Sequence, residues 1–202
     1  LRDAYLLRVG GYYKDNSLQS KTVWYQSIDS EVSYNKSQPY NYSDTRGLEF
    51  SLSKNMGDMR GYFNYTYSVR TQGNFGWGSQ YENDVTQATY ELTSTDHYQI
   101  KPVAEPFASA NLEYVAPKSM GPLADFRVTL NGGWRAGRHF TWVGPGGASV
   151  PGVNNNIQMR DFFFLNARLS KNFYVGGSRV MVFADIQNLL NWKYMYFSPY
   201  NP

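Results

Sequence analysis

Hydrophobic and polar residues alternate most regularly between residues 161 and 191. From Phe163 to Val175 the odd positions are mainly apolar, while the even positions include Asn, Arg and Ser. After a Gly-Gly-Ser turn at 176–178 the alternation returns, with Val180 and Val182 on one face. Alternation with a period of two on both sides of a Gly-Gly turn predicts a hairpin of two long antiparallel strands, each with one apolar face.

Five earlier stretches show the same alternation and predict further strands. The last of them is the most regular, with Phe126, Val128 and Leu130 on one side and Arg127 and Thr129 on the other. Most of these stretches are about ten residues long, which is the length that a strand needs to cross a bilayer. The five predicted strands cover residues 4–15, 45–54, 59–70, 108–114 and 126–137.

The connections between the predicted strands alternate in length. Transmembrane barrels of the bacterial outer membrane combine short periplasmic turns with long extracellular loops. Soluble β-domains have strands of about 5–6 residues on average. The pattern therefore predicts an all-β fold, an antiparallel transmembrane β-barrel segment with about seven long strands. The predicted connections are long at 16–40, 71–103 and 143–160, and short at 55–58, 118–122 and 176–178.

A barrel in lipid pairs every backbone group within the protein, so its side chains face either acyl chains or the interior. The apolar positions of the strands are expected to face outward. Aromatic residues beside the short turns are expected to form a girdle at the level of the lipid headgroups. The girdle residues are Tyr114, Phe126, Phe173 and Tyr174, and the outward residues are Leu48, Phe63, Tyr65, Leu112, Val128, Leu130, Leu165, Leu169, Val180 and Val182.

Composition agrees with strands that have a single apolar face. The 202 residues are 42% hydrophobic and 17% aromatic, yet the mean hydropathy is −0.55. No run approaches the roughly 18 apolar residues of a membrane-spanning helix. The net charge of +3 is spread along the chain without a basic run, so no nucleic-acid partner is expected. The chain starts at Leu1 without an initiator Met or a signal peptide, which suggests a mature or internal piece.

Several stretches also resemble one protein family. LNARLSKNF at 165–173 and VMVFADIQNLLNWKY at 180–194 resemble the end of the barrel domain of TonB-dependent outer-membrane receptors. NYSDTRGLEFSLSKNM at 41–56 and GYFNYTYSVRTQG at 61–73 are similar to strands that recur in that family. The resemblance covers nearly the whole chain, and its motifs describe barrel strands without a reactive centre.

The resemblance implies a barrel of about 22 strands filled by a plug. Such receptors import scarce large solutes (an iron chelate, a cobalamin-like cofactor or a glycan) with energy from the TonB complex. Residues 1–202 would then be a partial outer-membrane barrel domain that lacks the plug and the final strand. The implied partners are outer-membrane lipid and lipopolysaccharide, the plug and the other barrel strands, TonB acting through the plug, and a surface lipoprotein. Inward polar groups such as Glu49, Arg60, Glu113 and Arg127 are expected to bond the plug or neighbouring strands.

No pattern of catalytic or metal-ligating residues stands out, so the chain is expected to be no enzyme and to need no cofactor. The two His residues lack metal-ligand spacing, and the glycine-rich stretch at 73–78 lacks the Lys-Ser/Thr of a phosphate-binding loop. Aromatic rings can stack on sugars or chelate rings, and Arg can hold carboxylates. The alternative for each candidate is a place in the aromatic girdle or, for Arg138, at lipopolysaccharide phosphates. The candidate ligand-binding residues are Trp77, Tyr81, Tyr90, His97, Arg138, His139 and Trp142.

Two other functions fit the same strand pattern. One is a surface-exposed all-β adhesin or lectin that binds carbohydrate through loop aromatics. The other is a different outer-membrane barrel, such as a porin or an assembly protein. A plug domain upstream and a terminal aromatic strand downstream in the complete gene would favour the receptor over both.

Overall fold

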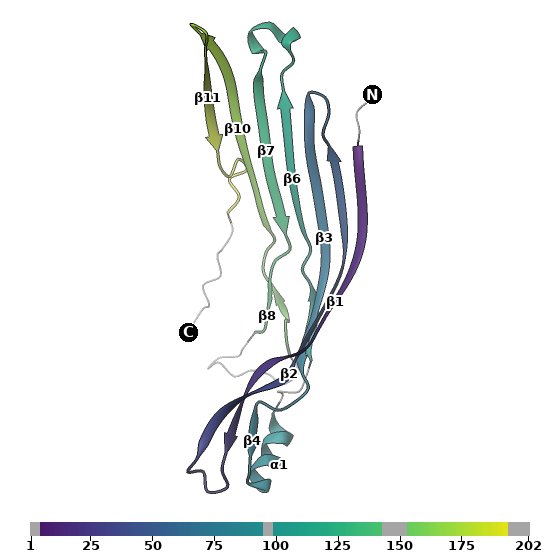
Figure 1. Cartoon of the computed structure of the whole chain (residues 1–202), viewed down its shortest axis with the longest axis vertical. Coiled ribbons are helices and arrows are strands. Elements are labelled where there is room, and N and C mark those ends of the chain that lie inside the picture. The colour runs from purple at the N-terminus through teal and green to yellow at the C-terminus, as the bar shows by residue number, and fades with distance from the viewer. Residues whose placement is uncertain (1–4, 95–98, 143–152, 194–202) are drawn as a thin grey trace.

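The fold is all-β, and its main part is a curled sheet shaped like half of a barrel (Figure 1). The structure, a computed structural model, describes residues 5–94, 99–142 and 153–193. Eight strands follow one another across the sheet in the order β11-β10-β7-β6-β3-β2-β1-β4, and β5 also pairs with β3. All neighbours are antiparallel except β4, which runs parallel to β1.

The principal strands are long, and each includes most or all of one of the alternating stretches of the sequence, although β1 and β2 extend well beyond theirs. Two short strands, β8 (His139–Phe140) and β9 (Ile157–Gln158), form a separate hairpin. The described helices are α1 (Asp84–Thr93) and the 3-10 helix η1 (Lys118–Leu123). The strands of the main sheet are β1 (Tyr5–Gln26), β2 (Ser33–Lys54), β3 (Met59–Asn74), β4 (Ser79–Tyr81), β5 (Ile100–Ala104), β6 (Phe107–Val115), β7 (Phe126–Arg135), β10 (Phe162–Val175) and β11 (Ser178–Ile186).

The predicted connection at 16–40 is wrong, because most of it is strand. β1 and β2 continue through it and pair as far as Gln26 with Ser33, so the hairpin turns only at residues 27–32. Side chains and a third strand support the backbone pairing here, since the Tyr25 ring stacks on Tyr34 and β4 pairs with residues 24–26 of β1. The predicted loop at 71–103 is also partly wrong, since it contains the end of β3, then β4, α1 and β5. Of the predicted loop at 143–160, residues 143–152 lie outside the described residues.

The short connections lie together at one end of the sheet. The turn between β2 and β3, η1 between β6 and β7, and the turn between β10 and β11 are at the top of Figure 1. The far ends of β1 and β2, with β4 and α1, extend to the bottom of the same view. The alternation of short and long connections along the sequence therefore places the short connections at one end of the sheet and the long ones at the other.

Strand register separates the residues into two faces, because directly paired residues share a face. One row of partners runs through Leu112, Leu130, Ala167 and Ile186. The ten residues that were expected to face outward all fall on this side, so their common face is confirmed. We call it the apolar face and define it by Leu7, Val9, Leu48, Phe50, Leu52, Phe63, Tyr65, Leu112, Val128, Leu130, Leu165, Leu169, Val180 and Val182.

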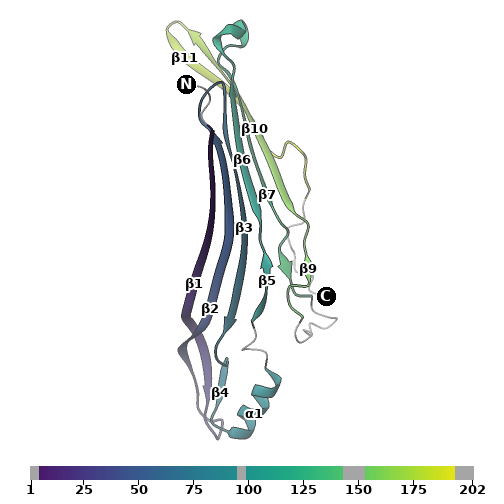
Figure 2. The same ribbon diagram turned by 90° about the vertical axis from the view of Figure 1, so that its right-hand side faces the viewer.

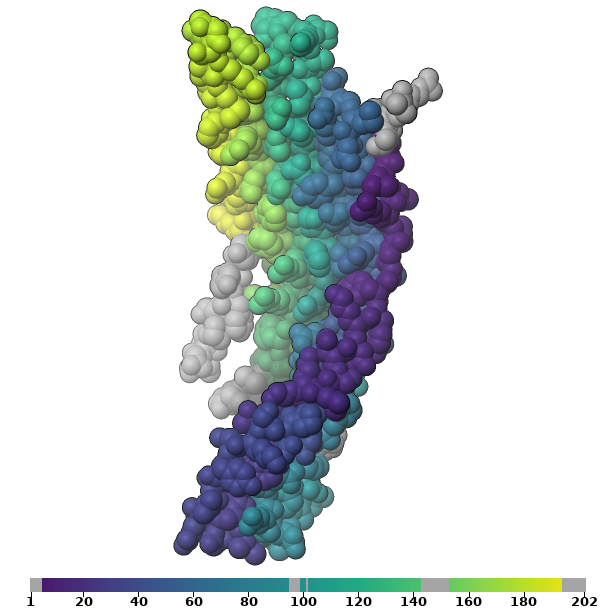
Figure 3. Space-filling model, viewed as in Figure 1, coloured from purple at the N-terminus to yellow at the C-terminus, as the bar shows by residue number. Residues whose placement is uncertain are grey.

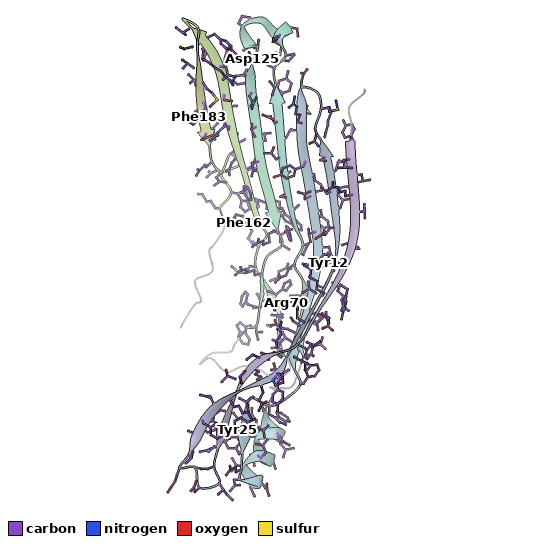
Figure 4. All side chains as sticks on the ribbon, viewed as in Figure 1. Tyr12, Tyr25, Arg70, Asp125, Phe162 and Phe183 are labelled. Carbon is purple, nitrogen blue, oxygen red and sulfur yellow. The ribbon has the colours of Figure 1, made fainter. Side chains whose placement is uncertain are left out.

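The opposite side, which we call the polar face, has mainly hydroxyl, amide and charged side chains. Figure 4 shows side chains projecting from both sides of the sheet. The rows of partners on this side do include some large apolar groups, such as Phe162 and Phe183. The residues that define the polar face are Arg8, Glu49, Ser51, Asn64, Thr66, Ser109, Asn111, Glu113, Arg127, Thr129, Asn131, Arg168 and Asp185.

The sheet has almost no core of its own. Within the described residues, the buried hydrophobic side chains are Val23, Ala116 and Ala167. The accessible surface is 14671 Å², whereas a compact monomer of this mass would expose about 9,700 Å². Figures 2 and 3 show the reason, since the long strands form a thin, elongated layer. Large side chains of the apolar face remain exposed, including Val9 at 71% and Leu48 at 62%.

Neither described helix is long and apolar enough to cross a membrane.

Candidate functional site

Three of the predicted ligand-binding residues come together at the far end of the sheet, where β4 pairs with β1. The ring centroids of Trp77 and Tyr90 are 5.9 Å apart, those of Tyr81 and Tyr90 5.5 Å, and those of Trp24 and Tyr81 5.5 Å. All three pairs meet edge to face, the arrangement that the ring quadrupoles favour. We call Trp24, Trp77, Tyr81 and Tyr90 the aromatic cluster.

The aromatic cluster fastens α1 to β4. The hydroxyl of Tyr90 accepts a hydrogen bond from the backbone N–H of Ser79 at 3.2 Å, and the side chain of Gln87 accepts one from Tyr81 N–H at 2.8 Å. The helix begins at Asn83, whose side chain accepts hydrogen bonds from two backbone N–H groups of the first turn. The rings are half-buried against one another, so their main role in this structure is to pack α1 onto β4 and β1.

The other predicted residues lie after β7, on or beside the β8–β9 hairpin. Arg138 is exposed and His139 is half-buried, while Trp142 is 47% exposed and held by a hydrogen bond from its backbone N–H to Asn156. This hairpin is a different sheet from the one that carries the aromatic cluster. His97 lies outside the described residues. Among those described, no group of His, Asp and Glu could hold a metal ion.

A group of polar residues that the sequence analysis did not single out lies where β1, β2 and β3 run side by side. A polar hollow of about 280 Å³ opens between them. The register of β1 against β2 shifts on both sides of Gln19, and the preceding residue, Leu18, has a φ of 55°. Such β-bulges redirect side chains and recur beside functional sites. The residues lining the polar hollow are Gln19, Asn41, Tyr42, Ser43, Arg70, Gln72, Gly73 and Asn74.

The tip of the β1–β2 hairpin presents a second aromatic surface. Tyr25 and Tyr34 are cross-strand partners whose rings stack with centroids 5.2 Å apart and an angle of 6° between planes. Gln38 donates a hydrogen bond to the Tyr25 hydroxyl at 2.7 Å, and Tyr34 is 55% exposed. In the turn itself, the Ser27 hydroxyl and then a backbone N–H hold the pKa of Asp29 below its ordinary value.

Charged residues on the polar face pair with neighbouring strands. Glu113 and Arg127, both expected to face inward, form a salt bridge of 2.9 Å between β6 and β7. Arg168 makes two hydrogen bonds to the carboxylate of Asp185, at 2.5 and 2.7 Å. The side chains of both pairs are substantially exposed, so each pair links neighbouring strands but contributes little stability in water.

Comparison with known proteins adds no relative, since no family model, curated protein or solved structure matches this chain.

Proposed function

We propose that this chain is part of the wall of an outer-membrane β-barrel, and that the whole protein is an active importer of the TonB-dependent receptor type. The observation that carries the proposal is the apolar face, which is continuous across seven strands and exposed on a sheet whose described residues bury very few hydrophobic side chains. An exposed apolar patch of more than a few hundred Å² indicates a membrane or protein partner.

The height of the apolar face fits a bilayer. Along β7 the apolar positions run from Phe126 to Trp134, which is about 27 Å at 3.4 Å per residue. A strand tilted by about 40° would therefore span roughly 21 Å of membrane thickness, close to the band of about 25 Å in outer-membrane barrels. The charges on this face lie at or beyond the limits of that band. Lys54 ends β2 and Lys171 lies opposite Phe126, while Asp15, Asp44 and Arg46 lie farther along β1 and β2 than the level of Trp134.

The polar face suits the interior of a barrel. Its paired charges and amides would be costly against acyl chains but stable against water or a plug. The edge strands β1 and β11 have unpaired backbone groups along most of their outer sides in the described sheet. In lipid these groups must be paired, so the proposal requires further strands to close the barrel.

Import is the function that fits such a barrel together with the sequence resemblance. The long-connection end would face outside and receive the scarce solute, and energy would arrive from the TonB complex through the plug. The aromatic cluster would then be an extracellular structure that shapes the entrance. No step of covalent chemistry is required of this chain.

Cell fractionation and a growth assay test the proposal in two stages. The full-length protein is expected in the outer-membrane fraction, where it should run faster on a gel before boiling than after. Growth on the imported solute at limiting concentration should then be lost equally on deleting the receptor gene or the inner-membrane energy complex. Recovery in the soluble fraction would contradict the barrel, and growth that is independent of the energy complex would contradict active import.

The stacked rings of Tyr25 and Tyr34 favour one alternative, a surface-exposed carbohydrate-binding adhesin. An exposed aromatic face can stack on a sugar ring. The two functions differ in the growth assay, since an adhesin would leave solute uptake unchanged when its gene is deleted.

A further inference from the structure

We infer that the polar hollow between β1, β2 and β3 is a binding site for an acidic saccharide, in which Arg70 holds the carboxylate and the surrounding amides hold hydroxyl groups. The inference rests on the proposed function, because it takes the polar face to be the side that the imported solute passes. It adds a chemical class for the solute and a place where the solute is recognised.

The backbone forms the hollow at an energetic cost. Leu18, a residue with a Cβ, adopts a left-handed φ of 55° in the bulge of β1, a conformation that is strained for any residue other than glycine. Without the bulge, Gln19 would continue the regular pairing of β1. With it, Gln19 pairs with Asn41 at the hollow. Local strain of this kind concentrates at functional sites.

Strand register brings six of the eight lining residues to one side of the sheet, and the other two, Tyr42 and Gly73, are partners on the opposite parity. Asn41 is the partner of Asn74, and Ser43 is the partner of Gln72. Arg70 follows two positions along the same side of β3, so these groups alternate with residues of the opposite face. Side-chain amides offer both donors and acceptors, and this combination matches the hydroxyl groups of a sugar.

Arg70 makes the hollow positive. It is exposed and forms no ion pair among the residues that the structure describes. Lys14 lies on the same side beyond Thr45. The acidic residues Asp15 and Asp44 are cross-strand neighbours, and both lie on the opposite face. Glu105 follows β5 beside Ser68 on the polar side and makes no ion pair with Arg70.

An unpaired guanidinium among amides favours a ligand that is both anionic and hydroxylated. Arg recognises carboxylates through two parallel hydrogen bonds. The volume of about 280 Å³ is near the lower limit of small-molecule pockets. The hollow therefore accommodates one sugar ring, which can be a unit of a longer chain.

The experiment measures binding of three probes to the full-length protein in detergent by saturation-transfer NMR. The probes are glucuronate, glucose and inorganic phosphate. Glucuronate should bind at least tenfold more tightly than either glucose or phosphate. Arg70→Gln should weaken glucuronate binding at least tenfold, and Gln72→Met at least threefold. Arg46→Gln is the matched control, because Arg46 lies on β2 but on the opposite face, and it should change nothing.

Two results would overturn the inference. Unchanged glucuronate binding in Arg70→Gln would show that the hollow does not hold the carboxylate. Phosphate binding as tight as that of glucuronate, with no effect of Gln72→Met, would show an anion patch without sugar recognition. Either result leaves the fractionation test untouched, so failure of this site is distinguishable from failure of the barrel. The wild-type circular dichroism spectrum is the criterion for a folded variant.

Discussion

An arginine placed in the centre of the apolar face should be far more damaging than one placed on the adjacent residue. Leu130 is the fifth of the ten residues of β7, and its cross-strand partners are Leu112 and Ala167. Thr129 has its side chain on the polar face, between Glu113 and Arg168. The two positions share a strand and a depth, so their comparison isolates the effect of the face.

The expected cost of Leu130→Arg follows from the position of Leu130 near the middle of the apolar band. A charged residue on the lipid face of a barrel costs about 2–4 kcal/mol at the midplane. Thr129→Arg places its charge beside the carboxylate of Glu113, which offsets the repulsion from Arg168. Its cost should stay below about 1 kcal/mol, the range of exposed charge pairs.

The assay is the urea-induced unfolding of the full-length protein in lipid vesicles, with tryptophan fluorescence as the signal. Leu130→Arg should lower the free energy of unfolding by the larger amount, and Leu130→Ala separates the added charge from the lost side chain. Equal tolerance of arginine at 129 and 130 would refute the assignment of this strand to a membrane.

Three further predictions concern other parts of the sheet. A Cβ at Gly133 would lie 2.4 Å from the ring of Phe164, so Gly133→Val should cost about 1–3 kcal/mol of unfolding free energy in the same assay, and equality with wild type would contradict the packing. Tyr90→Phe removes the acceptor for the Ser79 N–H and should speed hydrogen exchange of that amide. Unchanged exchange would show that this hydrogen bond does not hold α1 against β4. Hydrogen bonds to the carboxylate lower the pKa of Asp29, so NMR should show an ordered turn above the ordinary pKa of aspartate. The turn should lose order only as the pH falls through the lowered pKa, and a pH midpoint at the ordinary pKa would argue against these bonds.

The two faces of the sheet could be predicted from the sequence because each strand alternates independently of its neighbours. Residues such as Leu130 and Thr129 differ in polarity and are adjacent, which fixes their sides once the stretch is a strand. The lengths of the connections then predicted which strand ends lie together. Neither inference needs knowledge of contacts between distant residues.

The far part of the β1–β2 hairpin could not be predicted in this way. Its residues are mostly polar, and apolar ones such as Val23, Trp24 and Tyr25 are consecutive, so period-two alternation is absent although the backbone pairing continues. The polar hollow depends on the bulge at Leu18, where the register shifts by one residue. The residues around it show no alternation of polarity that would reveal the shift. The sequence named Trp77, Tyr81 and Tyr90 as ligand-binding candidates but did not predict that they pack on one another. Trp24 reaches them through the parallel pairing of β1 with β4.

The central claim is that the apolar face meets acyl chains, and site-directed spin labelling tests it most directly. The chain has no cysteine, so single cysteines at Arg127, Val128, Thr129 and Leu130 can each carry a label in the full-length protein in vesicles. The account predicts that labels at 128 and 130 collide preferentially with oxygen, which concentrates in the bilayer, and labels at 127 and 129 with a water-soluble nickel complex. Access of the nickel complex to 128 and 130, or shielding of both positions from both reagents, would contradict it.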